Sequence, residues 1–123
     1  MTAGRILIVD DDDAIQEFIC ASLVDEGYEV AVAANGQSAL ELARSFRPSL
    51  ILLDLRMPGM SGEHFLEVYN NAAGYKAPVI ALSASKMCRE QLFLLGASDC
   101  LPKPFNLTDL TCYVERWITA RAA

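Results

Sequence analysis

The sequence has few basic residues and no apolar run long enough to cross a membrane. Ten Lys and Arg residues stand against sixteen Asp and Glu, which gives a formal net charge of −6 at pH 7. Binding to a nucleic-acid backbone requires a basic surface that displaces counterions, so this balance argues against direct nucleic-acid binding. No apolar run approaches the ~20 residues that cross a bilayer, and the first five residues lack the regions of a secretion signal. We therefore expect a cytoplasmic protein that contacts no membrane.

Cysteine and histidine are too sparse and too scattered for a zinc site. The four cysteines, Cys20, Cys88, Cys100 and Cys112, form no C-x-x-C pair, and the single histidine, His64, is far from all of them in sequence. In a reducing compartment the cysteines are expected to be small apolar residues without a disulfide. His64 is expected to be a solvated surface residue.

Short apolar runs alternate with longer stretches of helical periodicity along the whole chain. The expected strands are Arg5–Val9, Glu29–Ala33, Leu50–Leu53, Val79–Leu82 and a weak one at Cys100–Leu101. The expected helices are 13–26, 36–46, 62–71, 86–95 and 107–120. Three of the runs are apolar at nearly every position, which is typical of parallel strands covered on both faces, whereas Glu29–Ala33 alternates and suits an edge. Five βα units predict one three-layer α/β domain spanning residues 1–123.

Two helix starts carry recognisable capping residues. Asp12 and Asp13 precede the first helix, where carboxylates accept hydrogen bonds from free backbone N–H groups and suit the helix dipole. Asn106 and Asp109 have the spacing of a capping box before the last helix. The inward stripe of the first helix is predicted to be Ile15, Phe18, Ile19 and Leu23, at spacings of three and four residues.

Polar residues follow four of the expected strands. Asp10 and Asp11 come after the first strand, Asp54 after the third, Ser83 after the fourth and Lys103 after the fifth. Ligands of open parallel sheets bind beyond the carboxyl ends of the strands, so these side chains converge if the first and third strands are neighbours.

The chemistry of these residues suits phosphoryl transfer. Three close carboxylates repel one another unless a cation intervenes, and hard oxygen ligands with free positions suit Mg²⁺. A carboxylate can act as a nucleophile and form an acyl phosphate, so Asp54 is the predicted acceptor. Lys103 would pair with one phosphoryl oxygen and Ser83 would donate a hydrogen bond to another.

Four segments, at the expected spacings and in order over nearly the whole chain, resemble the receiver domain of bacterial response regulators. They are residues 6–12 (ILIVDDD), 50–62 (LILLDLRMPGMSG), 78–84 (PVIALSA) and 96–105 (GASDCLPKPF). The resemblance implies a flavodoxin-like (βα)5 doubly wound fold with strand order 2-1-3-4-5. It also implies a cis peptide bond at Lys103–Pro104.

The resemblance further implies a function as a phosphoacceptor, a signalling protein that assists its own phosphorylation and dephosphorylation. Asp54 would take a phosphoryl group from the phosphohistidine of a sensor histidine kinase or phosphotransfer protein. Mg²⁺ would be bound by Asp11, Asp54 and the backbone carbonyl of Arg56, with Asp10 helping partly through water. Ser83 and Lys103 map to the hydroxyl and lysine of the family.

The sequence departs from the family at two places. Receivers usually carry an aromatic residue three positions before the lysine, and here that residue is Cys100, so the aromatic switch of the family is not expected in this chain. Leu92 to Leu95 are four consecutive apolar residues, which a helix cannot turn to one face, so Phe93 or Leu94 should be exposed. We expect the face made by this helix, the following strand and the last helix to bind an output domain or a second copy.

Two other functions are alternatives to this one. A flavodoxin-like module that binds a nucleotide or flavin phosphate would need a phosphate-binding loop after the first strand, where this chain has four Asp residues. A haloacid-dehalogenase-type phosphatase would need two acids as D-x-D on the first strand, together with a cap region and a longer chain.

Overall fold

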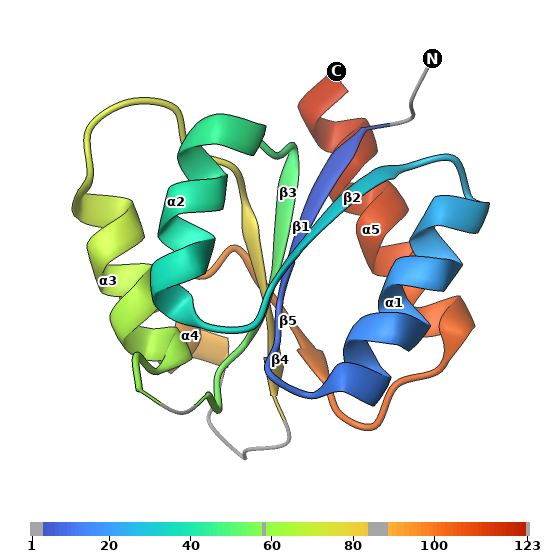
Figure 1. Cartoon of the computed structure of the whole chain (residues 1–123), viewed down its shortest axis with the longest axis horizontal. Helices are drawn as coiled ribbons and strands as arrows, with labels where there is room; N and C mark the ends of the chain where they lie inside the picture. Colours follow the sequence, from blue (N-terminus) through green and yellow to red (C-terminus); the bar gives the residue numbers. More distant parts are fainter. Residues whose placement is uncertain (1–3, 58, 84–88, 123) are drawn as a thin grey trace.

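The computed structural model describes residues 4–57, 59–83 and 89–122, in which strands and helices alternate along the chain (Figure 1). The strands are β1 (Arg5–Val9), β2 (Glu29–Ala33), β3 (Leu50–Asp54), β4 (Val79–Ser83) and β5 (Asp99–Pro102). The helices are α1 (Asp13–Asp25), α2 (Gly36–Phe46), α3 (Gly62–Asn71), α4 (Arg89–Leu95) and α5 (Leu107–Ala122). The predicted elements are therefore confirmed with small changes at their ends, and residues 86–88 of the fourth predicted helix lie outside the described residues.

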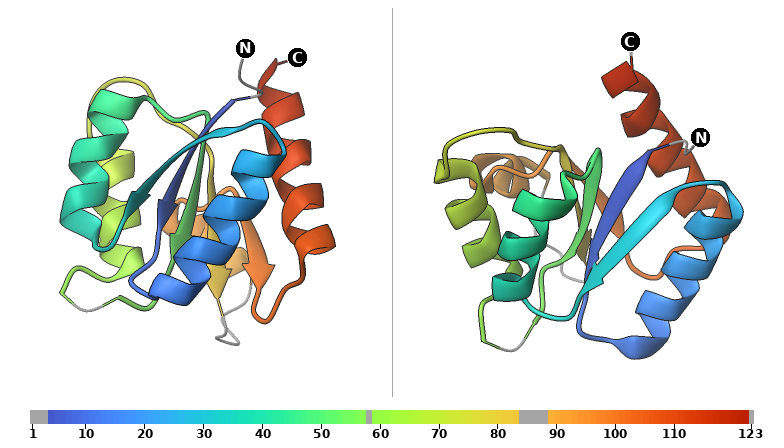
Figure 2. Two further views of the ribbon diagram at one scale, coloured as in Figure 1. Left: turned by 45° about the vertical axis from the view of Figure 1, so that its right-hand side comes forward. Right: turned by 45° about the horizontal axis from the view of Figure 1, so that its top comes forward.

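The five strands form one parallel sheet in the order β2-β1-β3-β4-β5. Helices α2, α3 and α4 cover one face and α1 and α5 cover the other, as the three views show together (Figures 1 and 2). This is the flavodoxin-like three-layer fold that the sequence predicts. The carboxyl ends of all five strands point to the same edge of the sheet, so the loops that follow them share one end of the domain.

The central strands are buried on both faces because each sends alternate side chains into two separate cores. Ile6 and Ile8 of β1 pack in the core under α1 and α5, whereas Leu7 and Val9 pack in the core under α2, α3 and α4. All four are fully buried. Burying an aliphatic side chain of this size contributes about 1.5–3 kcal/mol, which makes the middle of the sheet a stable platform for the loops at its end.

Strand β2 lies at the edge of the sheet, as its alternating sequence predicts. Glu29 and Val32 are exposed while Ala33 is buried. The Glu29 carboxylate accepts from Arg5 Nε at 2.8 Å, which links the beginnings of β1 and β2 across their parallel register.

The predicted capping residues act as expected at both helix starts. The Asp12 carboxylate accepts from the backbone N–H groups of Ala14 and Ile15, at 2.9 and 3.2 Å. At the start of α5, Asn106 Oδ1 accepts from the backbone N–H of Asp109 at 2.8 Å. In turn, Asp109 Oδ2 accepts from the backbone N–H of Asn106 at 3.3 Å. The capping box is therefore confirmed.

The prediction for Phe18 is wrong, because this residue is not part of the buried stripe of α1. Ile19 and Leu23 are fully buried, whereas the Phe18 side chain is 43% exposed. Consecutive residues are about 100° apart around a helix, so Phe18 is turned well away from Ile19, which faces the sheet. Its ring instead lines an apolar pocket beside the end of β5.

The described cysteines form no disulfide, and the described helices are not membrane spans. Cys20, Cys100 and Cys112 are free cysteines, and Cys88 lies outside the described residues. Within the described ranges, no helix combines the length and the apolar character that a membrane span requires.

Gly62, the first residue of α3, is expected to be essential for the connection that leaves β3. A Cβ atom at Gly62 would lie 2.5 Å from Leu55 Cα and 2.7 Å from the Asp54 carbonyl oxygen, and these backbone atoms cannot easily move. We expect Gly62→Ala to lower the free energy of unfolding by roughly 1–3 kcal/mol, measured by urea denaturation.

Gly36→Ala is the matched control, because Gly36 is likewise the first residue of its helix. A Cβ atom there would meet Met60 Sδ at 2.6 Å, Cγ at 2.8 Å and Cβ at 3.0 Å. Rotation of the Met60 side chain moves Sδ and Cγ, so a smaller loss of stability than at Gly62 is expected. An equal loss of stability in both variants would contradict the role given to the backbone contact at Gly62.

Candidate functional site

Four of the predicted site residues lie at the carboxyl edge of the sheet. Asp54 ends β3, Ser83 ends β4, and Asp10 and Lys103 directly follow β1 and β5. Because β1 is hydrogen-bonded to β3 and β3 to β4, these residues come to one place although 93 positions separate Asp10 and Lys103 in numbering. The backbone N–H of Lys103 donates to the Ser83 carbonyl at 2.9 Å, which fixes the end of β5 against the end of β4.

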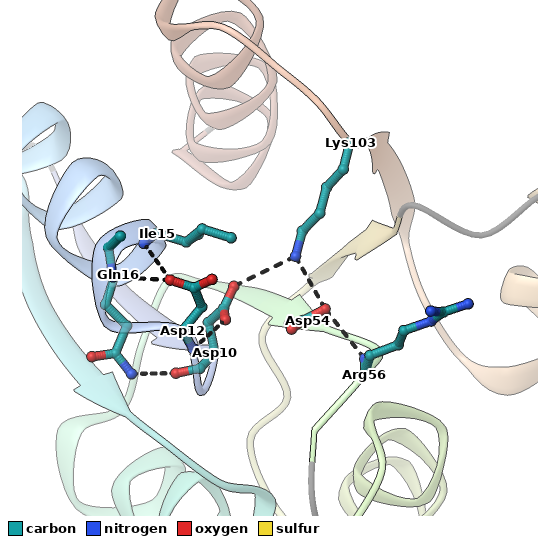
Figure 3. A network of polar contacts seen from close by, with 8 residues as sticks. Asp10, Asp12, Ile15, Gln16, Asp54, Arg56 and Lys103 are labelled. Carbon is teal, nitrogen blue, oxygen red and sulfur yellow. Dashed lines mark hydrogen bonds and ion pairs between the residues drawn. The ribbon is translucent and has the colours of Figure 1, made fainter.

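The Lys103 ammonium lies between two carboxylates (Figure 3). Its Nζ is 3.3 Å from Asp54 Oδ1 and 3.8 Å from Asp10 Oδ2. Both carboxylates are largely removed from water, where an ion pair is screened less than at the surface. The predicted contact between Lys103 and Asp54 is therefore present, and it reaches Asp10 as well.

Asp54 is held in place by its backbone neighbours as well as by Lys103. The N–H of Arg56 donates to Asp54 Oδ1 at 3.2 Å, and the N–H of Leu55 donates to the Leu82 carbonyl of the adjacent strand at 3.3 Å. Asp54 is only 6% exposed. The carboxylate thus has a fixed position at the rim of the sheet, which suits a group that must meet a second reactant in one geometry.

Asp10 is the most deeply buried acid of the group. Its Oδ1 accepts from the N–H of Asp12 at 2.9 Å, but its buried Oδ2 accepts no hydrogen bond from any described residue. Burial raises the pKa of Asp10 from 3.8 to about 6, and the nearby Asp54 carboxylate adds to the rise while Lys103 opposes it. An unsatisfied buried carboxylate oxygen is costly, so this position favours an additional cation.

Asp10, Asp11 and Asp54 together have the arrangement of an oxygen-ligand metal site. One carboxylate oxygen from each residue can be chosen such that all three lie within 4.8 Å of one another. Asp11 is exposed at the mouth of the group, while Asp10 and Asp54 are buried. Three carboxylates with an open side suit a divalent cation that keeps some of its water, as Mg²⁺ does. The donor set therefore fits the metal ion that the sequence predicts.

Ser83 and Arg56 are also among the predicted residues at this rim. Ser83 is buried at the end of β4, directly after Leu82, which pairs with Asp54 in the sheet register. Arg56 is exposed, and its backbone N–H rather than its guanidinium contacts Asp54. The hydroxyl of Ser83 and the carbonyl of Arg56 stay predictions.

The structure adds one polar contact that sequence reasoning missed. The side-chain amide of Gln16 donates to the Asp10 carbonyl oxygen, so α1 holds the backbone at the start of the acidic segment (Figure 3). The sequence carries no signal for this contact beyond the position of Gln16 in the first turn of a helix that follows Asp10.

An apolar surface adjoins the rim on the side of α1. Ile15 and Phe18 of α1 line a cavity of about 490 Å³ together with Lys103, Pro104 and Phe105. The peptide bond between Lys103 and Pro104 is cis, as the resemblance implies. Apolar side chains of α1 and of the segment after β5 thus lie next to Lys103. A second protein that covered the rim could make apolar contacts with them.

The residues at which the sequence departs from the expected pattern lie away from the charged centre. Cys100 is half-buried on β5 beside Ala81 and packs with the core under α2, α3 and α4. Phe93 and Leu94 of α4 are both exposed, and Leu94 is 88% exposed, which confirms that this helix cannot bury its apolar run. His64 is exposed on α3, as expected.

Comparison with known proteins identifies the family. The model of the response regulator receiver domain matches residues 6–115, which include all of the residues assembled above. The chain belongs to the response regulator receiver family. The family match therefore favours the receiver over the nucleotide-binding and phosphatase alternatives.

The receiver is similar to mycobacterial response regulators that are longer than this chain. It is 42% identical over 110 residues to response regulator MprA of Mycolicibacterium vanbaalenii, covering 86% of this chain and 46% of MprA. It is 38% identical over 113 residues to the DNA-binding response regulator MtrA of Mycolicibacterium smegmatis, covering 90% of this chain and 49% of MtrA. The chain thus spans about half the length of these relatives.

Solved receiver structures have the same fold. The chemotaxis response regulator CheY4 of Vibrio cholerae superposes with a TM-score of 0.85 at 33% identity, covering 92% of this chain and 97% of CheY4. The receiver domain of the sensor histidine kinase PA1611 of Pseudomonas aeruginosa superposes with a TM-score of 0.82 at 32% identity, covering 94% of this chain and 98% of that one. The PA1611 structure has a magnesium ion coordinated in its active-site cleft.

The burial of Asp10 predicts a pH-dependent effect of Asp10→Asn on stability in buffer without divalent cations. The folded protein holds the Asp10 proton with a pKa of about 6, against 3.8 as the ordinary value. The wild type therefore loses stability as the pH rises from about 4 to about 6, because the folded state must then carry a buried charge. The variant escapes this loss and is expected to be more stable by about 2–3 kcal/mol at about pH 8, with no gain near pH 4.

Urea denaturation over this pH range measures the effect, and Asp11→Asn is the matched control. Asp11 belongs to the same acidic group but is exposed, so removing its charge is expected to give a smaller gain. A gain in the free energy of unfolding of Asp10→Asn that does not change with pH would contradict the raised pKa of Asp10.

Proposed function

We propose that this receiver accepts a phosphoryl group on Asp54 from the phosphohistidine of a sensor histidine kinase or a phosphotransfer protein. The observation that carries the proposal is the position of Lys103, whose Nζ lies 3.3 Å from Asp54 Oδ1 at the rim of the sheet. A fixed ammonium at this place lowers the energy of the additional negative charge that arrives with a phosphoryl group.

The proposed step exchanges one bond to phosphorus for another. A carboxylate oxygen of Asp54 forms a bond to phosphorus, and the bond between phosphorus and the imidazole nitrogen of the donor breaks. The bonding electron pair stays on the imidazole nitrogen. That nitrogen takes up a proton, so the imidazole leaves as a neutral group. Lys103 pairs with one phosphoryl oxygen of the product, and the Ser83 hydroxyl donates to another.

Mg²⁺ is the proposed cofactor, held by Asp10, Asp11, Asp54 and the backbone carbonyl of Arg56. When bound, it supplies positive charge that offsets the repulsion between the carboxylates and the phosphoryl oxygens. The unsatisfied Oδ2 of Asp10 and the closeness of the three carboxylates support this assignment. The residues of the chain itself orient the acceptor, because Lys103 and the N–H of Arg56 both contact Asp54.

The protein is a signalling receiver and not a classical enzyme, since its own side chain becomes the product. We propose that it promotes its own phosphorylation and the later hydrolysis of the acyl phosphate. A cytoplasmic location without contact to nucleic acid or membrane is part of this proposal. The net charge of −6 supports it, because this domain would be repelled by phosphate backbones.

Phosphorylation from a small donor tests the acceptor directly. Incubation with phosphoramidate and Mg²⁺ is expected to add the mass of one phosphoryl group to the intact chain, as measured by mass spectrometry. Asp54→Asn should remove this gain, because the amide cannot act as the nucleophile. Asp25→Asn, an exposed acid near the other end of α1, is the matched control and should keep the gain.

Omission of Mg²⁺ should slow the uptake by roughly 10-fold or more if the carboxylates need a cation. Unchanged phosphorylation of Asp54→Asn would contradict the assignment of the acceptor. Equal rates with and without Mg²⁺ would contradict the assignment of the cofactor alone.

We propose that the face made by α4, β5 and α5 binds the output domain or partner, and that a second copy binds through it when the receiver is phosphorylated. The exposure of Phe93 and Leu94 supports this face, because two large apolar side chains on a short helix favour burial against a partner. Cys100 on β5 means that the change at this face does not use the aromatic side chain usual in the family.

Leu94→Glu is expected to prevent the second copy from binding. Light scattering should show a dimer of the wild type in beryllofluoride and Mg²⁺, and a monomer of the variant under the same conditions. Val24→Glu, at a side chain that is 54% exposed on α1, is the matched control and should still dimerise. If the wild type stays monomeric both with and without beryllofluoride and Mg²⁺, the proposal that a second copy binds at this face is wrong.

A further inference from the structure

A second cavity lies between α2 and α3, at the end of the domain opposite Asp54. The two helices run side by side over the same face of the sheet, and the segment that follows α3 returns past their carboxyl ends (Figures 1 and 2). The cavity has a volume of about 290 Å³. Its apolar lining comes from Leu40 and Ala43 of α2 and from Val68 and Ala72 at the end of α3.

Cationic side chains surround this apolar cavity. Arg44, Arg47 and Lys76 line it, and among the described residues no Asp or Glu does. This is an unusual local balance in a chain that has sixteen acidic and ten basic residues. Lys76 has a structural explanation, because its ammonium donates to the carbonyl oxygens of Ala72 and Gly74 near the carboxyl end of α3.

The two arginines have weaker local roles. Arg44 lies in the last turn of α2, where a cation suits the negative end of the helix dipole. Within residues 4–57, 59–83 and 89–122, the ion pairs of arginine are those of Arg5 with Glu29 and of Arg116 with Asp99, so neither Arg44 nor Arg47 has a carboxylate partner. The Arg47 guanidinium lies over the Tyr75 ring, 5.7 Å from its centroid.

The backbone at Arg47 has an uncommon conformation. Its φ is 53°, which makes Arg47 the one non-glycine residue with positive φ among those the structure describes. The left-handed conformation costs a non-glycine residue roughly 1 kcal/mol, and asparagine or glycine usually ends a helix in this way. Arg47 therefore ends α2 in a conformation that glycine or asparagine adopts more readily.

We propose that this cavity binds a small amphipathic anion, namely a phosphate monoester with a compact aromatic or aliphatic body. The forked guanidinium groups of Arg44 and Arg47 match the oxygens of a phosphate in charge and geometry. The apolar lining from α2 and α3 receives the body of the ligand. The volume lies near the lower limit of ligand cavities, about 300–1,000 Å³, so the body has the size of a single ring.

The shape and charge of the domain favour a free ligand over a membrane lipid with the same phosphate. The cationic residues surround a small concave site and do not form a broad basic surface, while the net charge of −6 opposes approach to an anionic bilayer. The proposal is independent of the phosphorylation of Asp54, because the cavity shares no residue with that site.

Titration of the full chain with phenyl phosphate, followed by amide NMR shifts, tests the proposal. We expect the amides of Arg47, Val68 and Tyr75 to shift in a saturable way. Inorganic phosphate lacks the apolar body and benzyl alcohol lacks the charge, so each should bind at least about 10-fold more weakly, a difference of roughly 1.4 kcal/mol. Equal binding of inorganic phosphate, or no saturable shift with phenyl phosphate, would overturn the proposal.

The double variant Arg44→Gln, Arg47→Gln should weaken phenyl phosphate binding about 10-fold or more, while the uptake of a phosphoryl group on Asp54 stays unchanged. Arg116→Gln is the matched control, because Arg116 also lies over a tyrosine ring, at 5.3 Å from Tyr113, but does not line the cavity. If the double variant binds phenyl phosphate as tightly as the wild type, the proposal that Arg44 and Arg47 bind the phosphate is wrong. Sedimentation with phosphatidic acid vesicles, combined with no binding of phenyl phosphate, would assign the arginines to a lipid instead.

Discussion

The structure depends on keeping like charges together at the edge of a buried sheet. Asp10 and Asp54 are both largely removed from water, and Lys103 is the cation of the chain that lies between them. Burial raises the pKa of Asp10 to about 6, and the neighbouring Asp54 carboxylate adds to the rise. A site that is short of positive charge in this way fits a divalent cation.

The rest of the domain supplies the stability that such a site lacks. Apolar strands fill two cores, one on each face of the sheet, and the acids are simply the next residues along the same strands. The backbone N–H groups of Asp12 and Arg56 then fix the two carboxylates, and the close contact of Gly62 with Leu55 fixes the loop after β3. The buried strands therefore end within one or two residues of Asp10 and Asp54.

Two clusters of charged side chains lie at opposite ends of the sheet. The carboxyl end concentrates acids around Asp54, whereas the other end places Arg44 and Arg47 around an apolar cavity. Helix α3 connects them, since Gly62 at its start contacts the backbone of Asp54 and Val68 and Ala72 at its end line the cavity. The face with Phe93 and Leu94 is a third region, on α4, and Cys100 beside it replaces the bulky ring found in most receivers.

The sequence by itself determined the elements, their parallel arrangement and the identity of the acidic rim, because apolar runs followed by polar residues mark the carboxyl ends of buried strands. It could not determine which side chains of α1 are buried, so Phe18 was misplaced. It gave no sign of Gln16 at the Asp10 carbonyl or of the cavity between α2 and α3. Those features were decided by the tertiary structure alone, since they depend on how far each helix is rotated against the sheet and its neighbours. The local pattern of one segment does not contain that angle, which follows from packing between segments that are distant in the chain.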